Sequence, residues 1–145
     1  MQVKIVLQEK GSEVVSTGLE TSLRDIVAIL DQRRVGAVVV SRDGRTLDGI
    51  VSERDVVRAL ARDGAAALDR PAREVMTTGE LSTCIPEDTV ESLMSVMTER
   101  RARHIPVVVD GALEGLVSIG DVVKARIAVL EGEARAMHDY IANPY

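Results

Sequence analysis

The sequence predicts an α/β (α+β) fold built from two tandem copies of a β-α-β-β-α unit. Nearly the same seven residues occur twice, as GIVSERD at 49–55 and as GLVSIGD at 115–121. These two segments are 66 residues apart, and the match begins at 47 and 113. Before it, one residue is lost in a turn, and 19–44 then matches 86–111 without a gap at a constant offset of 67 residues. Each copy also has the same order of polar and apolar residues. An internal repeat of this length is typical of a fold made of two similar units.

Each copy is expected to open with a short strand, near 13–17 or 81–84, and to continue as an amphipathic helix. The helix begins after Ser22 in the first copy and after Thr89 in the second, because a hydroxyl at this place caps free backbone N–H groups. Apolar residues then recur at helical spacing. They are Leu23, Ile26, Val27 and Leu30, and in the second copy Val90, Leu93, Met94 and Met97.

Two aliphatic runs on either side of Asp-Gly predict a β-hairpin in each copy. The runs are 37–40 and 47–51 in the first copy, and 105–109 and 113–117 in the second. A second helix follows, capped by Ser52 or by Ser118. Its inward face is predicted to contain Val56, Val57 and Leu60, or in the second copy Val122, Val123, Ile127 and Leu130.

These elements divide the chain into four segments. They are the first repeat at 1–68, a connector at 69–80, the second repeat at 81–130 and a C-terminal helical extension at 131–145. Each repeat is near the lower size limit for a separate hydrophobic core. We therefore expect the two repeats to pack sheet to sheet with pseudo-two-fold symmetry.

The composition excludes several classes of protein. Aromatic residues make up 1% of the chain and the net charge is −5, which disfavours binding to nucleic acid by stacking or by general charge attraction. Cys84 is the single cysteine, so neither an intramolecular disulfide nor a cysteine-rich zinc site is expected. No apolar run approaches membrane-spanning length, and the start of the chain lacks the pattern of a signal peptide. These features predict a cytoplasmic protein without a membrane partner.

A tandem β-α-β-β-α repeat whose copies each contain Gly-aliphatic-aliphatic-Ser-x-x-Asp before a helix resembles the CBS domain pair, or Bateman module. The resemblance covers about 13–124, and VMT at 75–77 and RHIPV at 103–107 support it. It implies a small stand-alone member that needs no obligatory cofactor. Such a protein would bind an adenosine-containing molecule between its repeats: AMP, ADP, ATP, an NAD-type dinucleotide or S-adenosylmethionine. It would form a homodimer and regulate a partner protein in trans.

The resemblance also implies a ligand-binding role for particular residues. Asp55 and Asp121 lie in the first turn of a helix, where a carboxylate can accept hydrogen bonds from both ribose hydroxyls. Ser52 and Ser118, with the free N–H groups of the helix start, are suited to a phosphate. The other candidates are Thr17, Ala37 and Val38 in the first copy, and Thr83, Arg103, His104, Ile105 and Pro106 in the second.

The two predicted sites differ in charge. Arg103 and His104 occupy the positions that Gly36 and Ala37 occupy in the first copy. The second site therefore offers additional cationic or polar groups to a polyphosphate or a dinucleotide. We favour the site at Asp121 over the weaker site at Asp55.

Two function classes stay open, the adenosine-binding regulatory module and an interaction scaffold. Ser-x-x-Asp at a helix start also has the outline of a capping box, which needs no ligand, so the chain could be an interaction scaffold without ligand affinity. An enzyme is not expected, because no Ser-His-Asp order, phosphate-binding glycine loop or HExxH metal motif occurs. The only histidines are His104 and His138.

Overall fold

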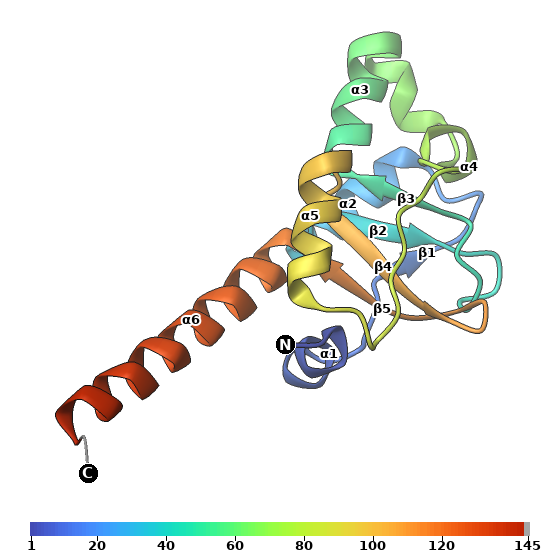
Figure 1. Ribbon diagram of the computed structural model, residues 1–145. Coiled ribbons are helices and arrows are strands. Elements are labelled where there is room, and N and C mark those ends of the chain that lie inside the picture. Colours follow the sequence, from blue (N-terminus) through green and yellow to red (C-terminus); the bar gives the residue numbers. More distant parts are fainter. Residues whose placement is uncertain (144–145) are drawn as a thin grey trace. The chain divides into compact units, whose positions relative to one another are not determined.

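The computed structural model describes residues 1–143 and divides into two compact units (Figure 1). Unit 1 comprises Met1–Ser12, Ser82–Val107 and the described residues from Leu116 onward, and unit 2 comprises Glu13–Leu81 and Val108–Gly115. The last two residues of the predicted extension 131–145 lie outside the described part of the chain. Helices and short strands make up both units, which confirms the predicted mixed α/β class.

Unit 2 contains the first repeat. Its elements are β1 (Ser16–Thr17), α2 (Leu23–Arg33), β2 (Ala37–Val40), β3 (Gly49–Ser52), α3 (Glu53–Asp63), the 3₁₀-helix η1 (Gly64–Asp69) and α4 (Ala72–Val75). The sheet has the order β1-β2-β3, with β1 parallel to β2 and β2 antiparallel to β3. Val38 and Val51 lie opposite each other and pack with Leu23 and Ile26 of α2 in an aliphatic core.

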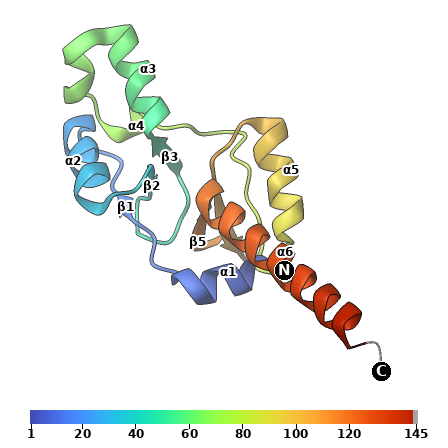
Figure 2. The same ribbon diagram turned by 90° about the vertical axis from the view of Figure 1, so that its left-hand side faces the viewer.

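Unit 1 contains most of the second repeat. Its elements are α1 (Val3–Lys10), α5 (Val90–Arg100), β4 (His104–Val109), β5 (Ala112–Ser118) and α6 (Ile119–Ala142); the tip of the β4-β5 hairpin is grouped with unit 2. Both α1 and α5 contact α6 (Figure 2). Val90 and Leu93 of α5 pack with Ile105, Val107 and Val117 in the core of this unit.

The predicted helix starts are confirmed. The Ser22 hydroxyl accepts the N–H of Asp25 at 3.2 Å, and the Thr89 hydroxyl accepts the N–H of Ser92 at 3.1 Å. Both helices also end alike, because Arg34 and Arg101 adopt the left-handed conformation with φ of 52° and 53°.

The two hairpins differ in their turns. Asp110 and Gly111 both have positive φ, which is the conformation of a tight two-residue turn between β4 and β5. In the first repeat Val40 pairs with Gly49, so residues 41–48 form a longer loop. The Asp43 carboxylate organises that loop by accepting the N–H groups of Arg45 and Thr46 at 2.9 and 2.7 Å. The first Asp-Gly therefore marks a loop rather than a tight turn.

The strand predicted at 81–84 is wrong. Only a single parallel bridge forms there, between Cys84 and Val107. In the first repeat, the N–H of Val39 donates to the carbonyl of Val15 at 3.0 Å. Pro106 occupies the position that matches Val39, and proline has no N–H to donate.

Part of the predicted inward face of the second helix is also wrong. Val57 is 65% exposed, and Leu60, Val123, Ile127 and Leu130 are also exposed. The side chains that enter the cores are Ala59 in α3, and Val122 and Ala125 in α6. These helices have apolar residues on two faces, so the period alone did not distinguish the buried face from the exposed one.

The segment before each repeat packs in the unit of the other repeat. The N–H of Val3 donates to the carbonyl of Asp88 at 2.8 Å, and the N–H of Ala72 donates to the carbonyl of Thr21 at 2.8 Å. Asp88 and Thr21 are themselves a matched pair at the offset of 67. Helix α1, which the sequence analysis did not predict, therefore belongs with the second repeat, although the predicted segment 1–68 included it with the first.

Candidate functional site

Ser118 and Asp121 form a closed hydrogen-bonded corner at the start of α6. Asp121 Oδ2 accepts the backbone N–H of Ser118 at 2.8 Å and the Ser118 hydroxyl at 2.9 Å. In return, Ser118 Oγ accepts the N–H of Asp121 at 3.2 Å. The corner is a capping box with Asp in place of Glu, which confirms the structural role left open by the sequence.

Lys10 joins this corner from α1. Its Nζ lies 2.6 Å from Asp121 Oδ2 and donates to the carbonyl of Leu116 at 2.8 Å. Burial raises the pKa of Asp121, but the Lys10 hydrogen bond, the Ser118 N–H and the positive charge outweigh it, so that the pKa lies below its usual value. Asp121 is therefore an anion whose Oδ1 accepts no hydrogen bond from residues 1–143.

The matched corner at Ser52 and Asp55 has a different third member. Asp55 Oδ2 accepts the N–H and the hydroxyl of Ser52 at 2.8 and 3.0 Å. Asp55 Oδ1 accepts the Thr77 hydroxyl at 3.0 Å. Both oxygens of this carboxylate are thus engaged within the chain, and the neighbour is a neutral hydroxyl instead of an ammonium.

At the start of both α3 and α6, one backbone N–H group that could bind a phosphate already donates a hydrogen bond within the chain. The N–H of Glu53 donates to the carbonyl of Gly36 at 3.0 Å, and the N–H of Ile119 donates to the carbonyl of Arg103 at 2.8 Å. The serine hydroxyls are held in the capping boxes. A phosphate at either place would have to compete with these intramolecular hydrogen bonds.

The other predicted residues divide between the same two units. Thr17, Ala37 and Val38 lie in unit 2 with Asp55, whereas Thr83 and 103–106 lie in unit 1 with Asp121. The Val38 and Ile105 side chains are buried in the aliphatic cores, and their contact with a ligand stays a prediction. Ala37 and Pro106 are also buried, and the Thr17 hydroxyl donates to Thr21 at 2.6 Å.

Exposed polar groups of the predicted set are concentrated in unit 1. Thr83 and Arg103 are exposed, and His104 is half-buried. The Arg103 side chain makes no ion pair within residues 1–143. Its backbone carbonyl is bonded to α6, which keeps the residue beside the Ser118–Asp121 corner.

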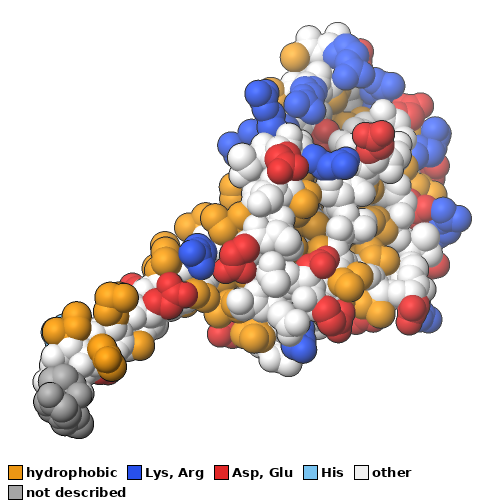
Figure 3. All heavy atoms as spheres, viewed as in Figure 1, with side chains coloured by type: hydrophobic (Ala, Val, Ile, Leu, Met, Phe, Trp, Pro, Cys, Tyr) orange, Lys and Arg blue, Asp and Glu red, His pale blue; other side chains and the backbone are white. Residues whose placement is uncertain are grey.

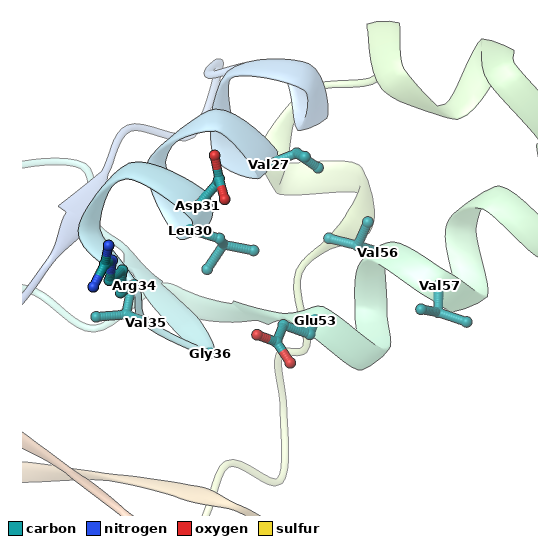
Figure 4. Close-up of a pocket in the computed structure, with 9 residues that line it drawn as sticks. All are labelled: Val27, Leu30, Asp31, Arg34, Val35, Gly36, Glu53, Val56 and Val57. Carbon is teal, nitrogen blue, oxygen red and sulfur yellow. The ribbon is translucent and has the colours of Figure 1, made fainter.

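A pocket of about 570 Å³ lies elsewhere, between α2 and the start of α3 (Figure 4). Its walls are mainly aliphatic, with Val27, Leu30 and Val35 on one side and Val56 and Val57 on the other. Asp31, Arg34 and Glu53 bring charge to it. None of the predicted ligand-binding residues is part of this lining.

The described residues contain neither a candidate metal site nor a candidate membrane-spanning helix. Within residues 1–143 no cluster of three or more His, Cys, Asp or Glu could hold a metal ion. None of the helices in this range is both long and apolar enough to span a membrane.

Comparison with known proteins decides the family. The family model described as CBS domain matches twice, over residues 11–62 and 72–128. This chain belongs to the CBS domain family. The two matches contain the two Ser-x-x-Asp corners, one in each CBS domain.

Relatives of this CBS pair include solved structures. A CBS-domain containing protein of Agrobacterium tumefaciens is 42% identical, with a TM-score of 0.83, over 87% of this chain and 99% of that one. A CBS domain protein of Pyrobaculum aerophilum, solved in complex with AMP, is 30% identical with a TM-score of 0.77, over 90% and 97% of the two chains. The mitochondrial CBS domain-containing protein CBSX3 of Arabidopsis thaliana is 35% identical over 97% of this chain and 71% of its own length.

Sequence reasoning missed the third member of each CBS corner, Lys10 and Thr77. The sequence contained no clear signal for either residue. The hydrogen bonds of Val3 and Ala72 relate the two preceding segments at an offset of 69, whereas Lys10 and Thr77 are 67 positions apart. Their different chemistry is a second asymmetry between the corners, beyond Arg103 and His104.

Proposed function

We propose that this CBS pair is a non-catalytic regulatory module that binds an adenosine-containing molecule such as AMP, ATP or an NAD-type dinucleotide. The observation that supports this most is the matched pair of carboxylates, Asp55 and Asp121, held in the same geometry at the start of α3 and α6. A carboxylate fixed by a capping box presents its charge without further loss of side-chain entropy. The relative from Pyrobaculum aerophilum, whose structure contains AMP, supports the ligand class.

The corner at Asp121 is the better candidate for the ribose. Asp121 Oδ1 is available as an acceptor, whereas Asp55 Oδ1 already accepts the Thr77 hydroxyl. Two cationic side chains, Lys10 and Arg103, belong to the surroundings of Asp121 and could neutralise a phosphate. Ser118 and His104 would complete the polar set. A ligand with more than one phosphate therefore fits this corner better than the other.

The ligand would act by shifting the population of conformations and thereby change a partner protein in trans. A homodimer is part of this proposal, because α2 and α3 expose the apolar side chains Val27, Val57 and Leu60. The open aliphatic pocket between these helices is suited to side chains of a second copy. A cytoplasmic location also stays a prediction, and the relative from Arabidopsis thaliana is described as mitochondrial.

A scaffold without ligand affinity is the second candidate. The observation in its favour is that both capping boxes are complete within the chain, so neither corner requires a ligand for stability. The two candidates therefore differ only in the behaviour of the same corners toward nucleotides.

Thermal-shift titration with AMP, ATP, NADH and S-adenosylmethionine separates the two candidates. A ligand that binds only the native protein raises its stability by mass action, by about 2.7 kcal/mol at a hundredfold excess over Kd. The regulatory module predicts a concentration-dependent rise in Tm for at least one of the four compounds. No rise with any of them, up to millimolar concentration, would favour the scaffold.

A further inference from the structure

Lys10 is bound to the carboxylate that the proposed function assigns to a ribose. Its Nζ lies 2.6 Å from Asp121 Oδ2 and 2.8 Å from the carbonyl oxygen of Leu116, and all three residues belong to unit 1. The Lys10 and Asp121 side chains are 32% and 22% exposed, so a ligand can reach this ion pair from the surface. The corner therefore already contains a cation where a ribose hydroxyl would bind.

Oδ2 of Asp121 accepts more donors than its lone pairs readily serve. It accepts the N–H and the hydroxyl of Ser118 at 2.8 and 2.9 Å, in addition to the Lys10 ammonium. A carboxylate oxygen has about two lone-pair sites. Two vicinal ribose hydroxyls bind a carboxylate most simply with one hydroxyl on each oxygen. A ribose that shares the Asp121 carboxylate in this way would displace one donor from Oδ2.

Lys10 is the donor that would move. The two bonds from Ser118 close within one helical turn and form the cap of α6, so their loss would destabilise the start of that helix. Lys10 comes from α1, 111 positions away in the sequence, and its ammonium is carried on a flexible four-carbon stem. The bond to the Leu116 carbonyl would keep the ammonium beside the corner after it left Asp121.

An ammonium that leaves Asp121 needs another anion. Lysine is only a donor, and the neutral Leu116 carbonyl does not replace the charge of the carboxylate. A phosphate of the ligand would replace it through charge-assisted hydrogen bonds. An unphosphorylated nucleoside would weaken the Lys10–Asp121 ion pair without offering a substitute. Such a nucleoside should therefore bind this corner more weakly than its phosphate ester.

General charge attraction does not explain a preference for phosphate. The net charge of the chain is −5, and Figure 3 shows acidic side chains among the basic ones on the visible face. The matched corner at Asp55 has the neutral Thr77 hydroxyl as its third member, which has no charge to transfer to a phosphate. A preference for phosphate at Asp121 would therefore depend on one particular ammonium.

We propose that Lys10 is a specificity-determining residue, which makes the corner at Asp121 selective for phosphorylated adenine nucleosides by moving from Asp121 to a phosphate of the ligand. This inference rests on the proposed function and narrows its ligand class. Lys10 thus has two partners: Asp121 before the ribose binds, and the phosphate afterwards.

Isothermal titration calorimetry with AMP and with adenosine tests this exchange, because the two compounds differ only in the phosphate. Wild type should bind AMP on the order of tenfold more tightly than adenosine. Lys10→Met keeps the apolar stem and removes the charge. It should lower the affinity for AMP on the order of tenfold and leave the affinity for adenosine equal or higher. Lys10→Arg keeps the charge and should retain the preference for AMP.

Lys4→Met is the matched control, because it removes the same charge from an exposed position of the same helix. It should retain the preference for AMP. Repeating the titrations with Asp55→Asn present reduces the contribution of the other corner.

The outcomes separate this inference from the proposed function. A preference for AMP that is unchanged in Lys10→Met would overturn the inference and leave the proposed function in place. An equal loss of affinity for AMP and adenosine would do the same, because it would give Lys10 a purely structural role. Loss of the preference in Lys4→Met as well would show general charge attraction instead. If wild type bound neither compound up to millimolar concentration, the proposed function would fail, and this inference with it.

Discussion

Lys10 and Asp121 are 111 residues apart in sequence and form an ion pair of 2.6 Å in unit 1. Asp121 is also the N-terminal capping carboxylate of α6. One contact thus fixes α1, which precedes the first repeat, to the helix that ends the second repeat. It also places a positive charge beside the Asp121 carboxylate. A ribose bound to Asp121 would therefore share that carboxylate with the Lys10 ammonium.

Replacing Lys10 tests the energetic part of this relationship. The pKa of Asp121 is lowered in the native protein, so its contribution to stability is present above the unfolded value of about 3.9 and is lost as the pH falls through the native value. Lys10→Met should lower the free energy of unfolding by about 1 kcal/mol or less at pH 7. The difference from wild type should shrink below about pH 4 in urea titrations.

Lys4→Met is the matched control, because Lys4 is an exposed lysine on the same helix. It should leave the free energy of unfolding unchanged throughout this pH range. A pH-independent loss in Lys10→Met would mean that Lys10 acts by packing and not by its charge.

The two capping serines should have similar effects on stability. Ser52→Ala and Ser118→Ala each remove the acceptor for the N–H of the helix's third residue, and such changes typically cost about 1 kcal/mol. Ser12→Ala, at an exposed position outside the helices, should have little effect. Chemical denaturation of the three variants measures this, and a cost below about 0.3 kcal/mol at both caps would contradict the role of the capping boxes.

Gly49 should tolerate no side chain. A β-carbon there would lie 2.6 Å from Met76 Sδ and 2.9 Å from the carbonyl oxygen of Thr77. Met76 can move, but the backbone of Thr77 is bonded to Ile50 in both directions. Gly49→Ala should therefore destabilise the protein by about 1–3 kcal/mol. Gly132→Ala, with open space around it, should instead stabilise α6 by up to about 1 kcal/mol. Opposite signs in thermal denaturation are the expected result.

Cys84 should be inert in the folded protein. Burial, together with the charge of Asp88, raises the pKa of its thiol to about 12. Because the thiolate is the reactive form, native protein at pH 8 should react with a disulfide reagent at least about a hundredfold more slowly than free cysteine. Unfolding in urea should restore the ordinary rate. Prompt reaction without urea would show that this part of the core opens.

Much of the fold followed from the sequence because the signals were local. The caps at Ser22, Thr89, Ser52 and Ser118, the aliphatic strands and the Asp110-Gly111 turn all depend on neighbours a few residues away. Where the prediction failed, the cause was not local. The strand at 81–84 was lost through Pro106 on the adjacent strand, and Val57 and Val123 turned outward because tertiary packing selected another face.

The candidate site also combines local contacts, which the sequence predicts, with distant contacts, which it does not. The geometry of Ser118 and Asp121 could be predicted from their spacing, because a capping box is closed within one helical turn. The contact of Asp121 with Lys10 could not be predicted in that way, since the two residues are 111 positions apart in the sequence. The burial of Val38 and Ile105 likewise depends on side chains from other elements.

Isothermal titration calorimetry with AMP on wild type, Asp121→Asn and Asp55→Asn is the most direct test of the proposed function. Asparagine retains a side-chain oxygen for the capping box, so circular dichroism should confirm that both variants fold. The account predicts binding to wild type, a loss of on the order of tenfold or more in affinity in Asp121→Asn, and a smaller loss in Asp55→Asn. Equal affinity in all three proteins, or no heat of binding in wild type with AMP or ATP, would contradict it.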